Sequence, residues 1–394
     1  MIPIAKPLLG PEEAEAASRA VLSGWVSQGP EVATFEAEFA RYVGADFACA
    51  VSNCTTGLHL ALLGVGVRPG DEVITVSHSF IAGANAIRQC GAMPVFVDIE
   101  TDGYNIDPTA VELAITPRTR AILVVHQMGM PCNMPAILRV ARNAGIPVVE
   151  DAACAAGSEI RLGDTWRRIG HPLGDVVCFS FHPRKVITTG EGGMLTTNRA
   201  DLDAAFRLLR QHGMSVSDTA RHSSPQVVFE DYPVRGFNYR MTDIQAAIGR
   251  VQLTRLPGIV ARRRTLATRY GEKLALVRGI TAPNEPRWAR SNWQSYCVRL
   301  AEGIDQKALM QAMLDRGVAT RRGIMNMHQE AAHGDLPTVK LPRSVSARDT
   351  AILLPLYAQM TDADQDRVLS VLDSSLAAVR RRRTTRPLGL VDTP

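Results

Sequence analysis

The residues best suited to chemistry lie in three short segments, each of which directly follows an apolar run. These segments are residues 52–57, 150–153 and 180–193. Ligands of open α/β sheets bind beyond the carboxyl ends of the strands, so a site is expected at such positions. Each segment allows more than one interpretation when taken alone.

The first segment, residues 52–57, lies where an apolar run changes into an amphipathic one. A helix that begins here would present backbone N–H groups and its positive dipole end to a phosphate. Asn53 or Thr55 could also be an ordinary helix N-cap. Taken alone, the segment favours this simpler role.

The second segment ends an apolar run with the acidic pair Glu150 and Asp151, and Ala152 and Ala153 follow. Small residues allow a flat ring to lie close to the backbone. A carboxylate can keep a heteroaromatic nitrogen protonated, because a nearby negative charge favours the charged form. A metal ligand or a helix cap would have the same pattern, so both alternatives stay open.

The third segment places Lys185 five residues after Ser180 and continues into the glycine-rich residues 189–193. A single lysine is usually a solvated surface charge. Apolar and glycine-rich flanks favour a buried amine instead, and burial would lower the pKa of Lys185.

Together the three segments supply an amine, a carboxylate and an anion-binding turn. Pyridoxal phosphate requires an amine for its imine, a carboxylate at its ring nitrogen and an anchor for its phosphate. Asp151 and Lys185 follow successive predicted strands of the central sheet. The residues therefore predict a pyridoxal-phosphate site.

Short apolar runs alternate with amphipathic stretches over the first 250 residues. The runs are predicted as buried strands and the stretches as helices. This alternation is typical of an α/β fold with a mostly parallel sheet and helices on both faces. The predicted strands are 48–51, 72–76, 94–97, 121–125, 147–150 and 176–180, and predicted helices include 55–63, 80–89 and 134–143.

The pattern changes after about residue 256, which predicts a smaller C-terminal α+β domain. We expect a large domain over residues 1–255, with an N-terminal segment able to pack on the small domain, and the small domain over 256–394. Loop 215–231 is long and polar, and such a loop is either functional or disordered. The predicted elements of the small domain are a helix at 259–277, a strand at 294–300, and helices at 306–316 and after Thr361.

The composition is that of a well-packed protein of 394 residues, with 46% apolar and 21% charged residues. The net charge of +5 comes largely from arginines near the C-terminus. The body is close to neutral, which argues against a nucleic-acid partner.

The chain has seven cysteines without a CxxC pair, and several lie in apolar runs. This usage predicts reduced thiols in a cytoplasmic protein and no metal site. The N-terminus has no apolar secretion signal, and no apolar stretch approaches the roughly 20 residues of a membrane helix.

Seven motifs follow one another over nearly the whole chain. They are GWVSQGP (24–30), GDEVI (70–74), EDAA (150–153), SFHPRK (180–185), TGEGG (189–193), GFNYRMTD (236–243) and LPLY (354–357). As an ordered set they resemble the DegT–StrS family of nucleotide-sugar aminotransferases. The resemblance implies the aspartate-aminotransferase fold, that is, fold type I of the pyridoxal-phosphate-dependent transferases.

The resemblance implies a role for each matching residue. Lys185 matches the catalytic lysine that holds the cofactor as a Schiff base, and Asp151 matches the partner of its pyridine nitrogen. The active site would lie at a homodimer interface, crossed by the loop before Asn238. Further matches are Ser180, Thr55 and Thr56 at the cofactor phosphate, Phe80 stacked on the ring, and Asn238 at the phosphate of the neighbouring subunit. Phe80 could instead be a core residue.

Two positions depart from the family pattern. Cys54 stands where the family usually has glycine, and Cys154 where it has a glutamine or histidine that contacts a ring substituent. Cys154 would contact the ring edge more weakly, or act as a small buried filler. Family members with histidine at the position of Lys185 deoxygenate sugars, so this lysine favours transamination.

The resemblance therefore implies amine transfer from glutamate or glutamine to a nucleotide-linked keto-sugar, through the pyridoxamine phosphate form of the cofactor. Residues 236–243 resemble members that aminate 4-keto-6-deoxy sugars, such as perosamine synthases. Arg240, Arg321 and Arg322 are candidates for binding the donor's carboxylate. A cyclitol aminotransferase acting on a keto-inositol, a non-catalytic regulatory protein of the same fold and a cysteine desulfurase remain alternatives.

Overall fold

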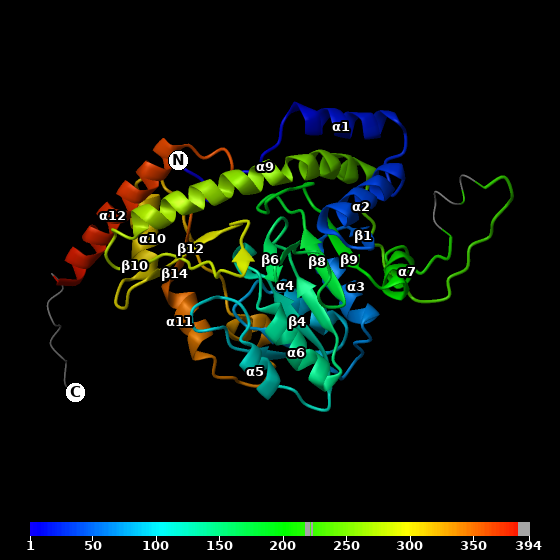
Figure 1. Cartoon of the computed structure of the whole chain (residues 1–394), viewed down its shortest axis with the longest axis horizontal. Helices are drawn as coiled ribbons and strands as arrows, with labels where there is room; N and C mark the ends of the chain where they lie inside the picture. Colours follow the sequence, from blue (N-terminus) through cyan, green and yellow to red (C-terminus); the bar gives the residue numbers. More distant parts are fainter. Residues whose placement is uncertain (217–220, 222–223, 385–394) are drawn as a thin grey trace.

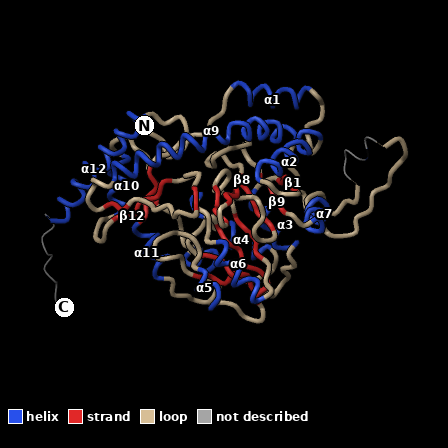
Figure 2. Tube along the Cα trace, in the orientation of Figure 1, coloured by secondary structure: helices blue, strands red, loops and turns tan. Residues whose placement is uncertain are grey.

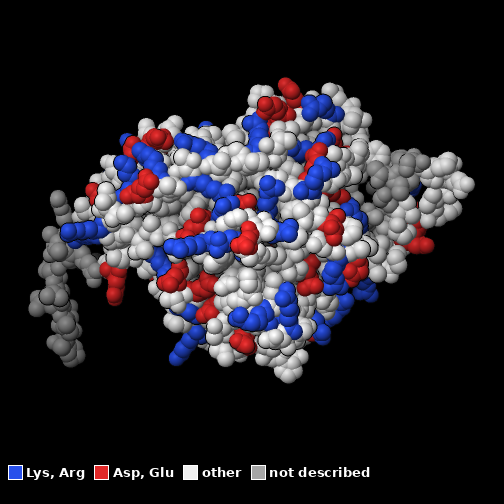
Figure 3. All heavy atoms as spheres, viewed as in Figure 1, with Lys and Arg blue, Asp and Glu red and all other residues white. Residues whose placement is uncertain are grey.

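The computed structural model describes residues 1–216, 221 and 224–384, with the side chains of 381–384 left aside. Parts of the arginine-rich tail and of loop 215–231 therefore lie outside the described residues. Within the described ranges, no helix combines the length and apolar character needed to cross a membrane. Basic and acidic side chains are interspersed over the face shown in Figure 3.

A seven-stranded sheet forms the centre of the molecule, in the order β1-β9-β8-β5-β4-β2-β3. The strands from β8 to β3 run parallel, while β9 is antiparallel to both β1 and β8. The predicted mostly parallel sheet is confirmed. The strand β9 was not predicted, because its short apolar run directly follows a glycine-rich motif. The strands are β1 (Phe47–Val51), β2 (Glu72–Val76), β3 (Met93–Val97), β4 (Thr119–Val125), β5 (Val148–Asp151), β8 (Val176–Ser180) and β9 (Gly193–Thr197).

Helices cover both faces of this sheet (Figures 1 and 2). On one face, α2, α5 and α6 pack around a core that includes Phe35, Phe39 and Phe179. On the other face, α3, α4 and α7 pack around Leu58 and Phe206. Strands buried on both faces are apolar throughout, which explains their continuous apolar runs. The helices are α2 (Pro30–Val43), α3 (Cys54–Gly64), α4 (Ala82–Gln89), α5 (Pro108–Leu113), α6 (Met134–Ala144) and α7 (Ala200–Leu209).

One long helix, α9 (Asp243–Leu274), spans the top of the molecule in Figure 1. Its N-cap is Thr242, whose side chain accepts a hydrogen bond from the N–H of Gln245. The predicted start at residue 259 is wrong. Pro257 suggests a helix boundary, but here it lies on an exposed face inside the helix. The expected domain boundary between residues 255 and 256 falls inside this continuous helix.

A four-stranded antiparallel sheet, in the order β10-β12-β14-β13, forms a second region. It packs with α10, α12 and the second half of α9 around Tyr270, Tyr296 and Leu372. The N-terminal segment joins this region, since the N–H of Ile2 donates to the carbonyl of Gly317 at 2.8 Å. The small sheet β11-β6-β7 joins the two regions. The remaining elements are α1 (Pro11–Leu22), β6 (Glu159–Leu162), β7 (Thr165–Arg168), β10 (Ile280–Thr281), β11 (Ala289–Arg290), β12 (Tyr296–Leu300), α10 (Gln306–Leu314), β13 (Arg321–Arg322), α11 (Pro342–Thr350), β14 (Ala351–Leu354) and α12 (Asp362–Thr384).

Candidate active site

The three predicted segments meet at one edge of the central sheet. Asp151 ends β5 and pairs with Cys178 of the neighbouring strand β8. Ser180 ends β8 and pairs with Gly193 at the start of β9, and Gly193 also pairs with Val51 at the end of β1. The carboxyl ends of β1, β5 and β8 therefore lie side by side, where ligands of such sheets bind.

The helix α3 begins directly after β1 and carries Thr55 and Thr56 in its first turn. The side chain of Asn53 accepts a hydrogen bond from the N–H of Thr56 at 2.9 Å, and the Thr56 hydroxyl donates to the Asn53 carbonyl at 2.7 Å. Asn53 is thus the N-cap, and both threonines are half-buried. The positive end of the helix dipole at this edge suits a phosphate.

Gly193 lies against the start of α3, and only glycine fits there. A Cβ atom at this position would lie 2.6 Å from the carbonyl carbon of Asn53 and 2.8 Å from the nitrogen of Cys54. This close approach joins the end of β8, with Ser180, to the first turn of α3. The TGEGG motif marks this glycine in the sequence, but its contact with a remote turn is visible only in the fold.

Asp151 is buried, with 7% of its surface exposed. Its carboxylate accepts a hydrogen bond from the N–H of Ala153 at 2.9 Å. Burial raises the pKa of Asp151 above its ordinary value, although the N–H of Ala153, Lys185 and His126 oppose this effect. A buried carboxylate in this state gains from a cationic partner such as a protonated pyridine nitrogen.

The neighbouring acid, Glu150, has a different role. Its Oε2 lies 3.0 Å from Nε2 of His126, and its Oε1 accepts from the N–H groups of Leu173 and Gly174. Successive strand residues point to opposite faces, so only Asp151 of the pair faces the site. Among the described residues, no three or more histidine, cysteine or acidic side chains are arranged to hold a metal ion.

Lys185 follows β8 in a tight turn, in which its N–H donates to the carbonyl of His182 at 2.8 Å. Its Nζ lies 3.2 Å from Sγ of Cys154. Burial acts to lower the pKa of Lys185, but Cys154 and Asp151 outweigh it and raise the pKa above its ordinary value. The predicted lowering is therefore wrong, because the flanking sequence does not show the partners that the fold brings to the amine.

Cys154 and Cys54 each contact one member of the pair formed by Lys185 and Asp151. Cys154 contacts Lys185, and Sγ of Cys54 lies 4.0 Å from Oδ1 of Asp151. Burial and the charge of Asp151 raise the pKa of Cys54 well above its ordinary value, so its thiol stays protonated at neutral pH. Cys154 is half-buried, whereas the other six cysteines are buried.

Asn292, just before β12, fixes the turn that carries Cys154. Asn292 is fully buried, and its Nδ2 donates to the carbonyls of Cys154 and Ala156, both at 2.8 Å. No motif in the sequence singles out this asparagine. Its contribution depends on packing between segments that are far apart along the chain.

Phe80 lies between β2 and α4, and 52% of its surface is exposed. It is therefore not a core residue. The fully buried His78 anchors this segment, with its Nδ1 2.8 Å from Oδ1 of Asn326. An exposed aromatic ring after a strand end suits stacking on a flat ligand, and this role of Phe80 stays a prediction.

Asn238 is exposed and forms an isolated β-bridge with Gln211. The carbonyl of the next residue, Tyr239, accepts a hydrogen bond from the N–H of Ser52 at 2.8 Å. The segment that carries Asn238 therefore borders the turn before α3. Its predicted contact with a neighbouring subunit stays a prediction.

Arg184 and Arg321 lie near each other, and Arg184 is next to Lys185 in the sequence. The pKa of Arg184 is lowered by burial and by repulsion from Arg321 of β13. Arg322 lies 3.7 Å from Glu330, and Arg240 is half-buried. Arg184 was not singled out by any sequence argument, because arginine next to a turn is usually a surface charge.

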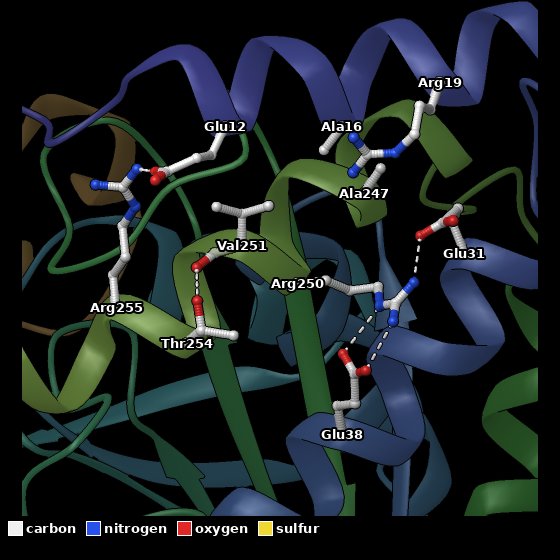
Figure 4. Close-up of a pocket in the computed structure, with 10 residues that line it drawn as sticks. All are labelled: Glu12, Ala16, Arg19, Glu31, Glu38, Ala247, Arg250, Val251, Thr254 and Arg255. Atoms are coloured by element: carbon white, nitrogen blue, oxygen red, sulfur yellow. Dashed lines mark hydrogen bonds and ion pairs between the residues drawn. The ribbon is translucent and has the colours of Figure 1, made fainter.

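A cavity of about 540 Å³ lies elsewhere, between α1, α2 and α9 (Figure 4). Arg250 bridges Glu31 and Glu38 there, and Arg255 pairs with Glu12. Its acidic side chains are thus matched by arginines. Paired charges of this kind are typical of a contact between helices. At the sheet edge, by contrast, burial outweighs the partners of Asp151.

Comparisons with known proteins agree with this geometry. The chain is 40% identical over 379 residues to the GDP-perosamine synthase of Caulobacter vibrioides, covering 95% of this chain and 98% of the relative. The crystal structure of the aminotransferase TlmJ from Streptoalloteichus hindustanus superposes with a TM-score of 0.88 at 36% identity, covering 96% of this chain and all of that one. The PMP-form of Spr1654 from Streptococcus pneumoniae, a putative sugar aminotransferase by its description, gives a TM-score of 0.90 at 26% identity, with coverages of 96% and 100%.

The family model described as DegT/DnrJ/EryC1/StrS aminotransferase matches residues 7–373. The predicted family and the predicted fold are therefore confirmed. This chain belongs to the DegT/DnrJ/EryC1/StrS aminotransferase family.

Proposed function

We propose that this enzyme transfers an amino group from glutamate or glutamine to a nucleotide-linked keto-sugar, with pyridoxal phosphate as its cofactor. The observation that carries the proposal is the meeting of Asp151 and Lys185 at one strand edge, beside a helix N-terminus suited to a phosphate. The relative from Caulobacter vibrioides, named GDP-perosamine synthase, supports a nucleotide-linked sugar as acceptor.

The described residues fit this cofactor. The first turn of α3, with Thr55 and Thr56, would bind the phosphate together with the hydroxyl of Ser180. Asp151 would accept the N–H of the ring, since burial raises its pKa despite the N–H of Ala153 and the nearby Lys185 and His126. Phe80 would stack on the ring, and Cys154 would lie at its edge. The cofactor, when bound, supplies an electron sink for the carbon that carries the amine.

Lys185 would perform the proton transfers of the reaction. Its amine lies at the same edge as Asp151, on a flexible side chain that follows β8. Once released from the cofactor, the neutral amine can take a proton from one carbon and return it to another. Asp151 would stay ionised throughout and hold the ring nitrogen protonated.

We further propose a homodimer in which Asn238 reaches the cofactor phosphate of the other subunit. The segment after Asn238 borders the turn before α3 in its own chain, through the bond between Ser52 and Tyr239. A two-fold axis near this segment would bring two sites close together. The described residues 224–231 extend away from the body in Figure 1, and a second copy would cover the exposed side chains of Val227 and Phe229 among them.

The acceptor is proposed to be a 4-keto-6-deoxy sugar. The test is an amine-transfer assay with a panel of nucleotide-linked 4-keto and 3-keto sugars and a keto-inositol, each with glutamate as donor. Transfer to a 4-keto sugar alone is the expected result. Transfer only to the keto-inositol would replace this proposal with the cyclitol alternative.

A Lys185→Ala variant tests the role of the lysine. It should bind the cofactor without the visible absorbance of a lysine-linked form, and it should not turn over. Normal turnover in this variant would refute the assignment of Lys185.

A further inference from the structure

Lys185 and Cys154 belong to different strand-end segments, yet their side chains meet at the sheet edge. The distance of 3.2 Å between Nζ and Sγ makes this contact a hydrogen bond from the amine to the sulfur. Cys154 is also the one cysteine of the seven that is not buried.

Of the two partners, Cys154 is the fixed one. Asn292 holds its carbonyl, and a neighbouring turn is closed by a hydrogen bond from the N–H of Ala155 to the carbonyl of Ala152 at 2.8 Å. A Cβ atom on Gly129 would lie only 3.1 Å from the Cys154 carbonyl, which shows how closely this backbone is packed. The amine of Lys185 sits on a four-carbon stem with free rotation. The fixed thiol of Cys154 therefore sets the position of the Lys185 amine.

Other polar groups around Lys185 have different partners. Asp151 of β5 accepts the N–H of Ala153, and the thiol of Cys54 on α3 points to Asp151. On the lysine's own segment, the ring nitrogen Nδ1 of His182 accepts the N–H of Arg184, and the guanidinium of Arg184 lies near Arg321. The amine of Lys185 instead donates its hydrogen bond to the sulfur of Cys154.

We propose that Cys154 is a positioning residue for Lys185, and that its sulfur holds the amine in place and protonated until the cofactor arrives. The inference rests on the proposed function, because it concerns how Lys185 captures pyridoxal phosphate. In that step the neutral amine bonds to the aldehyde carbon, the carbon–oxygen bond breaks, and the oxygen leaves as water with both protons of the amine. An ammonium group cannot attack, so the proton shared with Cys154 must leave first.

The proton affinity of Lys185 can be measured without any cofactor. In cofactor-free protein, acetic anhydride modifies neutral amines, and mass spectrometry of the Lys185 peptide across pH gives the titration of this one amine. Exposed Lys340 is the internal reference. In a Cys154→Ala variant, Lys185 should react about three- to tenfold faster at pH 7, because a lower pKa increases the fraction of neutral, reactive amine.

Two further variants separate a specific role from a structural one. Cys154→Ser keeps a hydrogen-bond acceptor, but the shorter carbon–oxygen bond places it farther from the amine, so its effect should lie between those of the native protein and Cys154→Ala. If Cys154→Ala fails to fold, the reactivity of Lys185 in Cys154→Ser tests the role of Cys154 instead. Cys90→Ala removes a buried thiol whose hydrogen bond goes to the His59 carbonyl, and it should leave the reactivity of Lys185 unchanged.

The rate at which added pyridoxal phosphate gains its lysine-linked visible absorbance is the second readout. It should rise at pH 7 in Cys154→Ala by the same factor as the acetylation rate. Native reactivity of Lys185 in folded Cys154→Ala and Cys154→Ser would overturn the inference. Absence of cofactor linkage in the native chain would overturn the proposed function instead, while the acetylation result would still decide the role of Cys154 toward the amine.

Discussion

Two buried carboxylates of the large α/β region, Glu36 of α2 and Asp151 of β5, have opposite surroundings. Glu36 pairs with Arg207 at 2.7 Å and with the buried Arg210. Burial acts to raise the pKa of Glu36, but the two arginines outweigh it and lower the pKa. The pKa of Asp151 is instead raised, because burial outweighs its hydrogen bond and the nearby Lys185.

The comparison distinguishes a buried carboxylate that stabilises the fold from one that can bind a ligand. A buried charge that the fold already compensates holds helices and strands together, and it has little left to offer a ligand. A buried charge with incomplete compensation is costly, and it recovers that cost when a cation binds. The carboxylate of Asp151 belongs to this second kind, whereas Cys154 and Asp151 more than offset the burial of the Lys185 amine.

The largest predicted effect is on stability, in a Glu36→Gln variant. It leaves Arg210 buried without its negative partner, so the free energy of unfolding should fall by about 3–5 kcal/mol, measured by urea denaturation. Because the folded-state pKa of Glu36 is lowered, its contribution is present above the unfolded pKa and is lost as the pH falls through the folded pKa. The variant and the native protein should therefore differ most at neutral pH, and equal stability there would contradict the comparison.

An Asp151→Asn variant should show the reverse behaviour. Turnover should fall by about 10²–10³-fold, as for other removed electrostatic groups at active sites. Because the folded-state pKa of Asp151 is raised, its protonated carboxyl group favours folding in acid, and this contribution is lost as the pH rises through the folded pKa. The cofactor-free variant should therefore melt at or above the native temperature at pH 7, by scanning calorimetry. A loss of stability as large as that of Glu36→Gln would contradict the proposed difference between the two carboxylates.

A smaller effect is expected at the glycine that joins β8 and β9 to α3. In Gly193→Ala the new methyl group meets the backbone of Asn53 and Cys54, which should cost about 1–3 kcal/mol and weaken cofactor binding, measured by fluorescence titration. The matched control is Gly258→Ala in α9, where a Cβ atom meets nothing within 4 Å. The control should be neutral or slightly stabilising. Similar losses of stability and cofactor binding in both variants would argue against a phosphate site at the contact of Gly193 with α3.

The smallest effect is expected in the charged cavity of Figure 4. Arg250 is only half-buried and bridges Glu31 and Glu38, each at 2.9 Å. In Arg250→Ala the free energy of unfolding should fall by no more than about 1 kcal/mol, and the difference should shrink in high salt. A loss as large as that of Glu36→Gln would show that exposure does not set the contribution of these pairs.

Some features of the fold and site were predictable from local sequence. The strands Glu72–Val76 and Val176–Ser180 have the predicted bounds, because their apolar runs end sharply at turns. The adjacency of Asp151 and Lys185 followed from their positions after β5 and β8, which are neighbours in the sheet. Strand β9 and the first half of α9 were missed, because a glycine-rich motif and Pro257 resemble loop and boundary signals.

Residue types, periodicity and the order of motifs were determined by the sequence alone, since these depend only on neighbours along the chain. They established the mostly parallel sheet, the family, and Asp151 and Lys185 as the principal candidates. The tertiary structure decided which groups meet: Cys154 with Lys185, Cys54 with Asp151, and Gly193 with Asn53. It also decided that the pKa of Lys185 is raised. Such pKa values depend on burial and on charges a few ångströms away, which packing alone brings together.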